Sequence, residues 1–223
     1  MILESKRLSA NIELPAYCCV SGNPAEHPMV LLLPGYGQTP EPFLDKFGDC
    51  FNGYSLCVLQ APFPVPVKAK DKQGLQIGYS WYAYDATTGT YHIPMSTAVN
   101  FCLQIINKLG FKSQIKKLIG YSQGGYLAPF VAREIPSVTQ VIGINCRFKN
   151  EDLDGHALPF RLDAINGASD RLVDPENAQR SHQKILEQGA RGSFRSVPGE
   201  GHEITPAILQ ELKKMLAPAE KRD

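Results

Sequence analysis

A serine flanked by glycines carries the clearest chemical signal in this sequence. Ser122 lies in Gly120-Tyr121-Ser122-Gln123-Gly124-Gly125, a G-x-S-x-G pattern that places the hydroxyl at a sharp turn between a strand and a helix. The apolar run 115–119 precedes the turn and a helical pattern follows it, as the motif requires. Glycines suit such a turn because they have no Cβ atom to collide with it. Ser122 is our candidate nucleophile, and the alternative is an ordinary serine in a glycine-rich turn.

Two later residues could activate that serine. A serine hydroxyl is a weak nucleophile at neutral pH and needs a base, most often a histidine that a carboxylate orients. On folds with this kind of turn, the chain order is Ser, then Asp or Glu, then His. Asp170 follows the apolar run 160–165, and His202 lies in Gly201-His202-Glu203-Ile204. We expect Ser122, Asp170 and His202 to form a catalytic triad.

Other acidic residues and histidines compete for these roles. Asp174 precedes Pro175 and fits the N-cap of a helix better than a catalytic acid. Glu200 is expected to face solvent. The remaining histidines break the chain order or fall within a helix, and we expect surface positions for His27, His92, His156 and His182.

The backbone of another glycine-rich turn could bind the oxyanion that forms on a substrate carbonyl. This turn, Leu33-Pro34-Gly35-Tyr36-Gly37-Gln38, closes an apolar run, and hydrolases with a serine elbow place a backbone donor there. We assign the N–H of Tyr36 to this role. The N–H of Gln123 is the second donor, because it follows the nucleophile at a helix N-terminus, where the helix dipole favours negative charge.

The elements that must position these residues alternate between strands and helices. Continuous apolar runs are typical of parallel strands buried on both faces, and they occur at Met29–Leu33, Leu56–Leu59, Ile115–Ile119, Gln140–Ile144 and Phe160–Ile165. Helical patterns lie at 41–47, 96–109, 124–134, 175–187 and 206–216. This alternation predicts an α/β fold with a mostly parallel central sheet flanked by helices, in a single domain over residues 1–223.

Four further segments lie outside these runs and helices. Alternating apolar residues over 8–14 predict an edge strand, and 17–20 predicts a second, antiparallel one. The proline-rich stretch 61–66 is interpreted as a loop over the strand ends. The connection between 145 and 160 is too short for a cap domain, so we expect no large lid.

Composition narrows the possible partners and the compartment. A net charge of +1 on 223 residues gives no field that favours nucleic acid. The N-terminus lacks the layout of a secretory signal, and no apolar run is long enough to cross a membrane. The six cysteines show no metal-ligand spacing, and Cys18 and Cys19 should point to opposite faces of a strand. We expect a cytoplasmic protein with reduced thiols, no metal and no other cofactor.

These motifs together resemble the phospholipase/carboxylesterase family of α/β-hydrolases, which includes acyl-protein thioesterases. The resemblance runs from Leu31 to Ile204 and rests on the two glycine-rich turns, Ala61-Pro62, Ser80-Trp81-Tyr82, Asn166-Gly167 with Asp170 and Val173, and Gly201-His202-Glu203-Ile204. The chain departs from the family pattern at Pro34 and Asn166, where the family has His, and at Asn145-Cys146, where it has Ser-Gly. None of these departures removes a triad member.

The resemblance implies a serine hydrolase that cleaves carboxylic esters or thioesters through an acyl-enzyme, with a carboxylesterase as our first choice. The substrate is a small ester or thioester, or an acyl chain on a carrier. Candidates to line its pocket are Trp81, Tyr82, Tyr84, Phe63 and Leu172. The alternatives are an acyl-protein or lysophospholipid-type thioesterase or lipase, and a non-catalytic binding protein of the same fold. Acyl-chain length and oligomeric state stay open.

Overall fold

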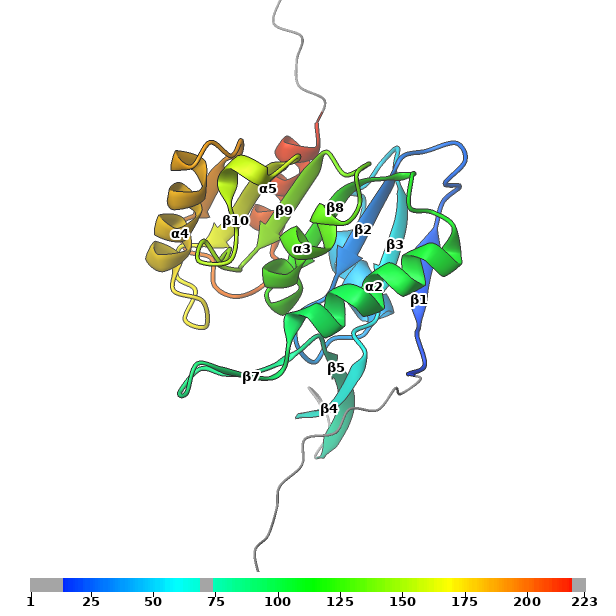
Figure 1. The fold of residues 1–223 in the computed structure, drawn as a ribbon, viewed down its shortest axis with the longest axis horizontal. Helices are drawn as coiled ribbons and strands as arrows, with labels where there is room; N and C mark the ends of the chain where they lie inside the picture. Colours follow the sequence, from blue (N-terminus) through cyan, green and yellow to red (C-terminus); the bar gives the residue numbers. More distant parts are fainter. Residues whose placement is uncertain (1–13, 69–73, 218–223) are drawn as a thin grey trace, which may run out of the picture.

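The computed structural model describes residues 14–68 and 74–217, and its centre is a seven-stranded sheet in the order β1-β3-β2-β8-β9-β10-β11 (Figure 1). Neighbouring strands are parallel, except that β1 pairs antiparallel with β3. The strands are β1 (Cys18–Ser21), β2 (Met29–Leu33), β3 (Ser55–Leu59), β8 (Ile115–Tyr121), β9 (Gln140–Ile144), β10 (Arg161–Gly167) and β11 (Phe194–Val197). The predicted mostly parallel sheet is confirmed.

Helices cover both faces of the sheet. They are α1 (Pro40–Leu44), which continues into a 3₁₀ turn (Asp45–Phe47), α2 (Met95–Leu109), α3 (Gln123–Arg133), α4 (Pro175–Glu187) and α5 (Pro206–Leu216). Side chains of α2, α3 and α4 pack on one face, and those of α1 and α5 pack on the other. Figure 1 shows α2 and α3 in front of the strands. All five predicted helices are confirmed to within a residue or two at their ends.

The central strands are buried on both faces, because successive side chains of each strand point alternately into two hydrophobic cores. In β2, Leu31 and Leu33 pack into the core beneath α2 and α3, whereas Val30 and Leu32 pack into the core beneath α1 and α5. Every residue of β2 is fully buried. This explains why such strands appear in the sequence as continuous apolar runs.

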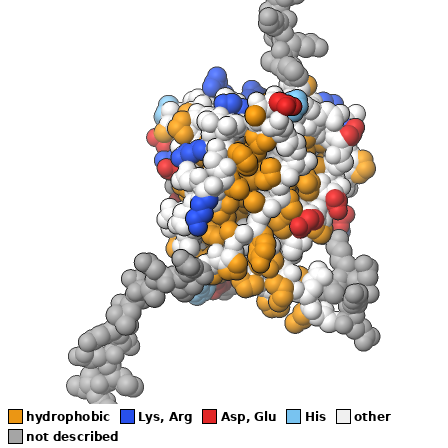
Figure 2. Space-filling view, turned by 90° about the vertical axis from the view of Figure 1, so that its right-hand side faces the viewer, with side chains coloured by type: hydrophobic (Ala, Val, Ile, Leu, Met, Phe, Trp, Pro, Cys, Tyr) orange, Lys and Arg blue, Asp and Glu red, His pale blue; other side chains and the backbone are white. Residues whose placement is uncertain are grey.

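The edge of the sheet at β1 is apolar on its outer side. Cys18 packs against one core and Cys19 against the other, so their side chains leave opposite faces as predicted, and both thiols are free. Tyr17 and Val20 are exposed, and Figure 2 shows hydrophobic side chains across this side of the molecule. The strand predicted over 8–14 falls outside the described residues except for Leu14, which belongs to no strand.

The proline-rich stretch is a strand, so the loop predicted there is wrong. β4 (Phe63–Lys68) pairs antiparallel with β5 (Leu75–Ser80) in a separate two-stranded sheet. Pro64 and Pro66 are two residues apart, so their missing N–H groups face the same side, which is compatible with pairing on the other side. The hairpin projects from the body of the molecule (Figure 1). A second small hairpin, β6 (Ala83–Asp85) with β7 (Thr90–Ile93), follows it.

The described residues contain neither a cap domain between β9 and β10 nor a helix that could span a membrane. Between β9 and β10 they hold only a 3₁₀ turn, Gly155–Ala157, so no cap domain is inserted there, as predicted. No helix in residues 14–68 or 74–217 combines the length and the apolar character needed to cross a membrane.

The surface position predicted for His182 is wrong, whereas His27, His92 and His156 are exposed as expected. His182 is buried on α4 between the rings of Phe148 and Phe194, and its Nε2 lies 2.9 Å from the carbonyl oxygen of Leu162. Burial lowers its pKa, because the charged imidazolium loses hydration, and this outweighs the bond to Leu162.

We expect this histidine to make folding sensitive to mild acid. The unfolded chain takes up a proton near the ordinary histidine pKa of about 6.5, whereas the folded chain resists it until lower pH. Stability is therefore complete above this range and falls as the pH drops through it. Melting temperatures at pH 7.5 and pH 5.5 should show a smaller acid-induced loss in His182→Gln than in wild type. His156→Gln is the exposed control, and an equal loss in all three proteins would contradict this account.

Candidate active site

Ser122 lies at the sharp turn between β8 and α3, as the motif predicted. Its backbone has φ 50 and ψ −119, a conformation that residues other than glycine rarely adopt. Its N–H donates to Ile144 O at 2.9 Å. A Cβ atom on Gly120 would lie 2.3 Å from Gly124 O, and one on Gly124 would lie 2.2 Å from Leu33 O. The glycines are therefore required by close backbone contacts, and the strained turn exposes the serine side chain.

The structure brings the three predicted triad residues into one hydrogen-bonded chain. His202 Nε2 lies 2.9 Å from Ser122 Oγ, and His202 Nδ1 lies 2.7 Å from Asp170 Oδ2. The other carboxylate oxygen of Asp170 accepts the N–H groups of Leu172 and Val173 at 2.8 and 3.0 Å. The Asp170 side chain is fully buried, so its orientation is fixed by these bonds, and the imidazole is held between acid and hydroxyl.

The competing acids lie elsewhere. Asp174 caps α4, since its side chain accepts the N–H of Glu176 at 3.0 Å, as expected. Glu200 contributes its backbone carbonyl, which accepts the N–H of Ser169 at 2.8 Å. Among the described residues, neither side chain forms a hydrogen bond with His202, so Asp170 is the acid that this geometry favours.

Asn145 supports the histidine loop, a role that the sequence did not reveal. It is fully buried with φ 48, and its amide nitrogen donates to Gly201 O and Glu203 O at 3.2 and 3.1 Å. Its amide oxygen accepts the N–H of Gly167 at 2.9 Å. One side chain thus ties the backbone on both sides of His202 to the end of β10. The available signal was a polar residue directly after an apolar strand.

The two backbone N–H groups assigned to the oxyanion site make no hydrogen bond within the described part of the chain. Among the described residues, nothing accepts the N–H of Tyr36 or of Gln123. The turn around Tyr36 is fixed, because the N–H of Gly37 donates to Tyr79 O at 2.8 Å and Gln38 Oε1 accepts the N–H of Gly35 at 2.8 Å. Two fixed N–H groups therefore remain available near the nucleophile, the arrangement that a developing oxyanion needs.

The side chain of Gln123 links the elbow to the segment 80–82. Its Oε1 accepts the N–H of Trp81 at 2.9 Å, and its Nε2 donates to Tyr82 O at 2.9 Å. Ser80 Oγ lies within hydrogen-bond distance of both amide atoms. Trp81 in turn donates its indole N–H to Pro34 O at 2.8 Å. These bonds join both proposed oxyanion donors through one buried segment.

We expect Gln123→Ala to weaken this segment while the backbone N–H at position 123 remains. The substitution leaves the N–H of Trp81 without its partner, whereas Tyr82 O keeps the bond from Ser80 Oγ. A buried group left unpaired costs about 1–3 kcal/mol. Urea unfolding should show a loss of free energy of that order or larger. Gln104→Ala, on the outer side of α2, is the matched control and should change stability by less than about 0.5 kcal/mol. Equal stabilities would contradict the proposed link.

Two cavities meet at the triad. One, of about 450 Å³, includes Ser122 and is walled by four tyrosines, Tyr36, Tyr82, Tyr84 and Tyr126. The other, of about 800 Å³, includes His202 and runs between α1 and the β4–β5 hairpin, where Phe43, Val67 and Ile77 line it. Tyr36 borders both cavities, so a substrate carbonyl at Ser122 would have space on two sides.

Only some of the residues predicted to line the substrate pocket border the cavity at Ser122. Tyr82 and Tyr84 line the cavity at Ser122. Trp81 does not, because it is fully buried and packs in the core with its N–H on Pro34. Phe63 lines a separate cavity beside α2, and Leu172 is an exposed surface residue. Trp81 and Phe63 therefore lie away from the cavity at Ser122, because an aromatic residue near a motif gives no sign of the direction of its side chain, and the role of Leu172 stays a prediction.

Comparison with known proteins identifies the family. The sequence matches the family model described as "Serine hydrolase (FSH1)" over residues 25–190. The chain belongs to this FSH1 serine hydrolase family. No curated protein matches the sequence. The family favours an enzyme over the non-catalytic binding protein that the sequence left open.

Solved structures similar to this FSH1 serine hydrolase include esterases and a thioesterase. Esterase PE8 has 20% identity and a TM-score of 0.66, with 93% of this chain and 98% of that chain covered. SOBER1 of Arabidopsis thaliana has 21% identity and a TM-score of 0.61, with 84% and 96% covered. Acyl-protein thioesterase 2 of Zea mays has 17% identity and a TM-score of 0.64, with 90% and 97% covered. At these identities the likeness shows a shared fold, the α/β-hydrolase fold. The family match and the shared fold together show a serine hydrolase of the α/β-hydrolase fold.

Proposed function

We propose that this hydrolase cleaves carboxylic esters through a triad of Ser122, His202 and Asp170 and a covalent acyl-enzyme. The observation that carries the proposal is the continuous hydrogen-bonded chain from Ser122 Oγ through the imidazole to the buried carboxylate. A base in contact with a hydroxyl, and an acid in contact with the base, are what nucleophilic attack by serine requires.

The geometry supports a two-step reaction. His202 Nε2 takes the proton of Ser122 as Oγ attacks the acyl carbonyl, and Asp170 stabilises the resulting imidazolium. The carbonyl oxygen becomes an oxyanion, which the N–H groups of Tyr36 and Gln123 bind. The bond to the leaving group then breaks as His202 returns its proton to that group. In the second step, water attacks the acyl-enzyme with His202 again as the base, and the carboxylic acid and free Ser122 are released.

The roles of the two cavities follow from the proton transfer. Because His202 must protonate the leaving group, we assign the larger cavity, which His202 lines, to the alcohol or thiol. The acyl group then occupies the smaller cavity around Ser122, where the tyrosines form the wall. The wall of this cavity consists mainly of tyrosines, whose hydroxyl groups are polar, and this favours short or medium acyl groups over a long fatty acyl chain. This supports a carboxylesterase rather than a long-chain thioesterase or lipase.

The state of the cysteines supports our proposal that the enzyme acts in a reducing compartment. All six thiols are free, and burial raises the pKa of Cys57 to about 12, so this thiol stays protonated and unreactive at neutral pH. We propose a cytoplasmic enzyme with a small-molecule ester as substrate.

A chain-length series tests the proposal. p-Nitrophenyl esters from acetate to decanoate should be hydrolysed with a maximum in kcat/KM below ten carbons, and palmitoyl-CoA should be a poorer substrate. A fluorophosphonate probe should label Ser122 and abolish hydrolysis in the same proportion. A maximum at palmitoyl-CoA would transfer the assignment to a thioesterase. Absence of both labelling and hydrolysis would overturn the proposed triad.

A further inference from the structure

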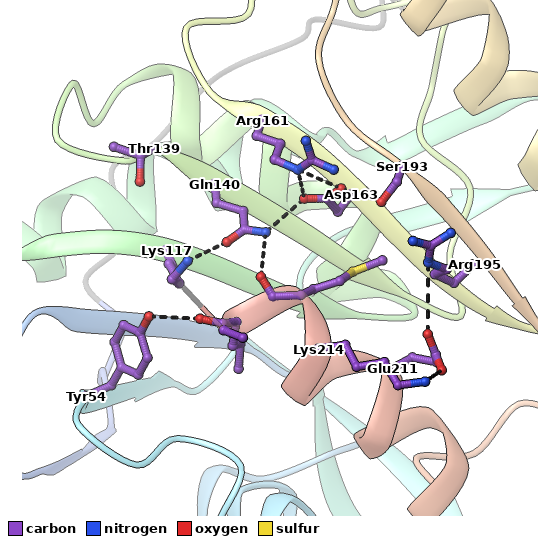
Figure 3. Close-up of a pocket in the computed structure, with 13 residues that line it drawn as sticks. Tyr54, Lys117, Thr139, Gln140, Arg161, Asp163, Ser193, Arg195, Glu211 and Lys214 are labelled. Carbon is purple, nitrogen blue, oxygen red and sulfur yellow. Dashed lines mark hydrogen bonds and ion pairs between the residues drawn. The ribbon is translucent and has the colours of Figure 1, made fainter. Parts of the chain in front are cut away.

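A further cavity, drawn in Figure 3, lies at the opposite edge of the sheet from the triad. It has a volume of about 610 Å³ and is bordered by the first residues of β9 and β10 and by the last turns of α5. Lys117 near the start of β8 lines it, whereas Ser122 follows the end of that strand. Five residues of extended chain correspond to about 16 Å, so this cavity is separate from the proposed reaction centre.

A buried carboxylate forms one wall of the cavity, and its charge is already balanced. Asp163 is fully buried, and both of its oxygens accept from Arg161 Nε at 3.0 and 2.8 Å. Gln140 Nε2 and Ser193 Oγ each donate to it at 2.8 Å. Asp163 therefore has no need of a further cation, and it orients Arg161 and Gln140 at the edge of the sheet.

The charge of the Lys117 ammonium group is balanced less completely than that of Asp163. It donates to Gln140 Oε1, and it lies 5.8 Å from the centre of the Tyr54 ring. In the part of the chain that the structure describes, no carboxylate forms an ion pair with it. Burial lowers the pKa of Lys117, although the nearby charge of Asp163 opposes this shift. A half-buried cation without a paired anion is costly, and a bound anion would remove that cost.

The charges around the cavity are unequal. Two carboxylates line the cavity, those of Asp163 and Glu211. They are outnumbered by four cations, which belong to Lys117, Arg161, Arg195 and Lys214. Glu211 pairs with Lys214 and, at 3.9 Å, with Arg195. The excess of two positive charges exceeds the net charge of +1 of the whole chain. Figure 3 shows the four cations around the cavity, with Asp163 and Gln140 between them. A concave surface with this excess concentrates a positive potential.

We propose that this cavity binds a small organic phosphate as its dianion, with Lys117, Arg161 and Arg195 as the phosphate ligands. Arg161 uses only Nε toward Asp163, so its two terminal nitrogens keep their donors for a ligand. The planar guanidinium group suits phosphate oxygens because it donates two parallel hydrogen bonds. Tyr54, Met215 and Leu216 supply an apolar wall for the organic part.

Calorimetric titration with phenyl phosphate at pH 7.5 and low salt tests this site. At that pH a phosphate monoester is mostly dianionic, since its second pKa is about 6. Wild type should bind phenyl phosphate, inorganic phosphate should compete with it, and Lys117→Met should weaken binding at least tenfold. Ser122→Ala should keep full binding, which separates this cavity from the triad.

Lys116→Met is the matched control, because it removes the same charge one residue away, where the side chain bonds to Ser113 O outside the cavity. Ester hydrolysis by Lys117→Met should stay within twofold of wild type, which shows that the variant is folded. Phenyl phosphate should raise the melting temperature of wild type and Lys116→Met, but not of Lys117→Met. Equal weakening in both lysine variants, or no binding by wild type, would overturn the proposal.

Discussion

Ser122→Ala is expected to lower kcat for p-nitrophenyl ester hydrolysis by about 10⁶-fold, the scale found when a triad serine is removed from a serine hydrolase. The substitution removes the only proposed nucleophile and leaves the backbone donors of Tyr36 and Gln123 in place. A small residual rate over water is therefore expected from these donors and from substrate binding. The melting temperature should change little, because alanine has the same backbone strain as serine at this turn.

Ser169→Ala provides the control for this loss. Ser169 lies next to Asp170 and is exposed, and its structural contact is a backbone bond from its N–H to Glu200 O. Its substitution should leave kcat within twofold of wild type. If Ser122→Ala retained more than a hundredth of the wild-type rate, a different nucleophile would have to carry the reaction.

Asp170→Asn is expected to lower kcat by about 10⁴-fold, since the corresponding change in a serine protease has that effect. The asparagine side chain can still accept the N–H groups of Leu172 and Val173, which bond to one oxygen of Asp170. Its amide group would instead donate to His202 Nδ1, so the imidazole proton would move to Nε2. A protonated Nε2 cannot accept the proton of Ser122, and the base would be held in the wrong tautomer.

Asp174→Asn is the matched control for this tautomer argument. It makes the same chemical change four residues later, at the N-cap of α4, where asparagine caps as well as aspartate. Steady-state kinetics at neutral pH should show wild-type rates for Asp174→Asn. Similar losses in the two variants would show that the effect arises from the fold of this loop and not from the imidazole.

The fold and the proposed triad could be predicted because their signals are local. Continuous apolar runs marked the buried strands, and the turn after β8 required glycine at positions where a Cβ would meet backbone atoms. The strand ends then placed Asp170 and His202 at one edge of the sheet. The proline-rich strand was missed because its pairing partner, β5, is separated from it by six residues and carries no comparable pattern.

The supporting contacts could not be predicted, because they join residues far apart in the chain. The bonds from Asn145 to the histidine loop span 56 and 58 residues, and those from Gln123 to segment 80–82 span 41 to 43. Neither contact leaves a periodic pattern in the sequence. The burial of His182 was missed for a similar reason, since the aromatic rings around it come from other elements.

The base of the β4–β5 hairpin has a consequence for how this enzyme can diversify. A Cβ atom on Gly78 would lie 2.2 Å from Gly37 O, whereas Leu75 and Ile77 on the same strand are exposed to solvent. Mutations at Leu75 or Ile77 can accumulate without disturbing the backbone that holds the Tyr36 amide, but a side chain at Gly78 would displace it. Ile77 lines the cavity that we propose for the leaving group, so selection can alter leaving-group preference there, and a mutant library for new ester substrates should vary Ile77 while keeping Gly78.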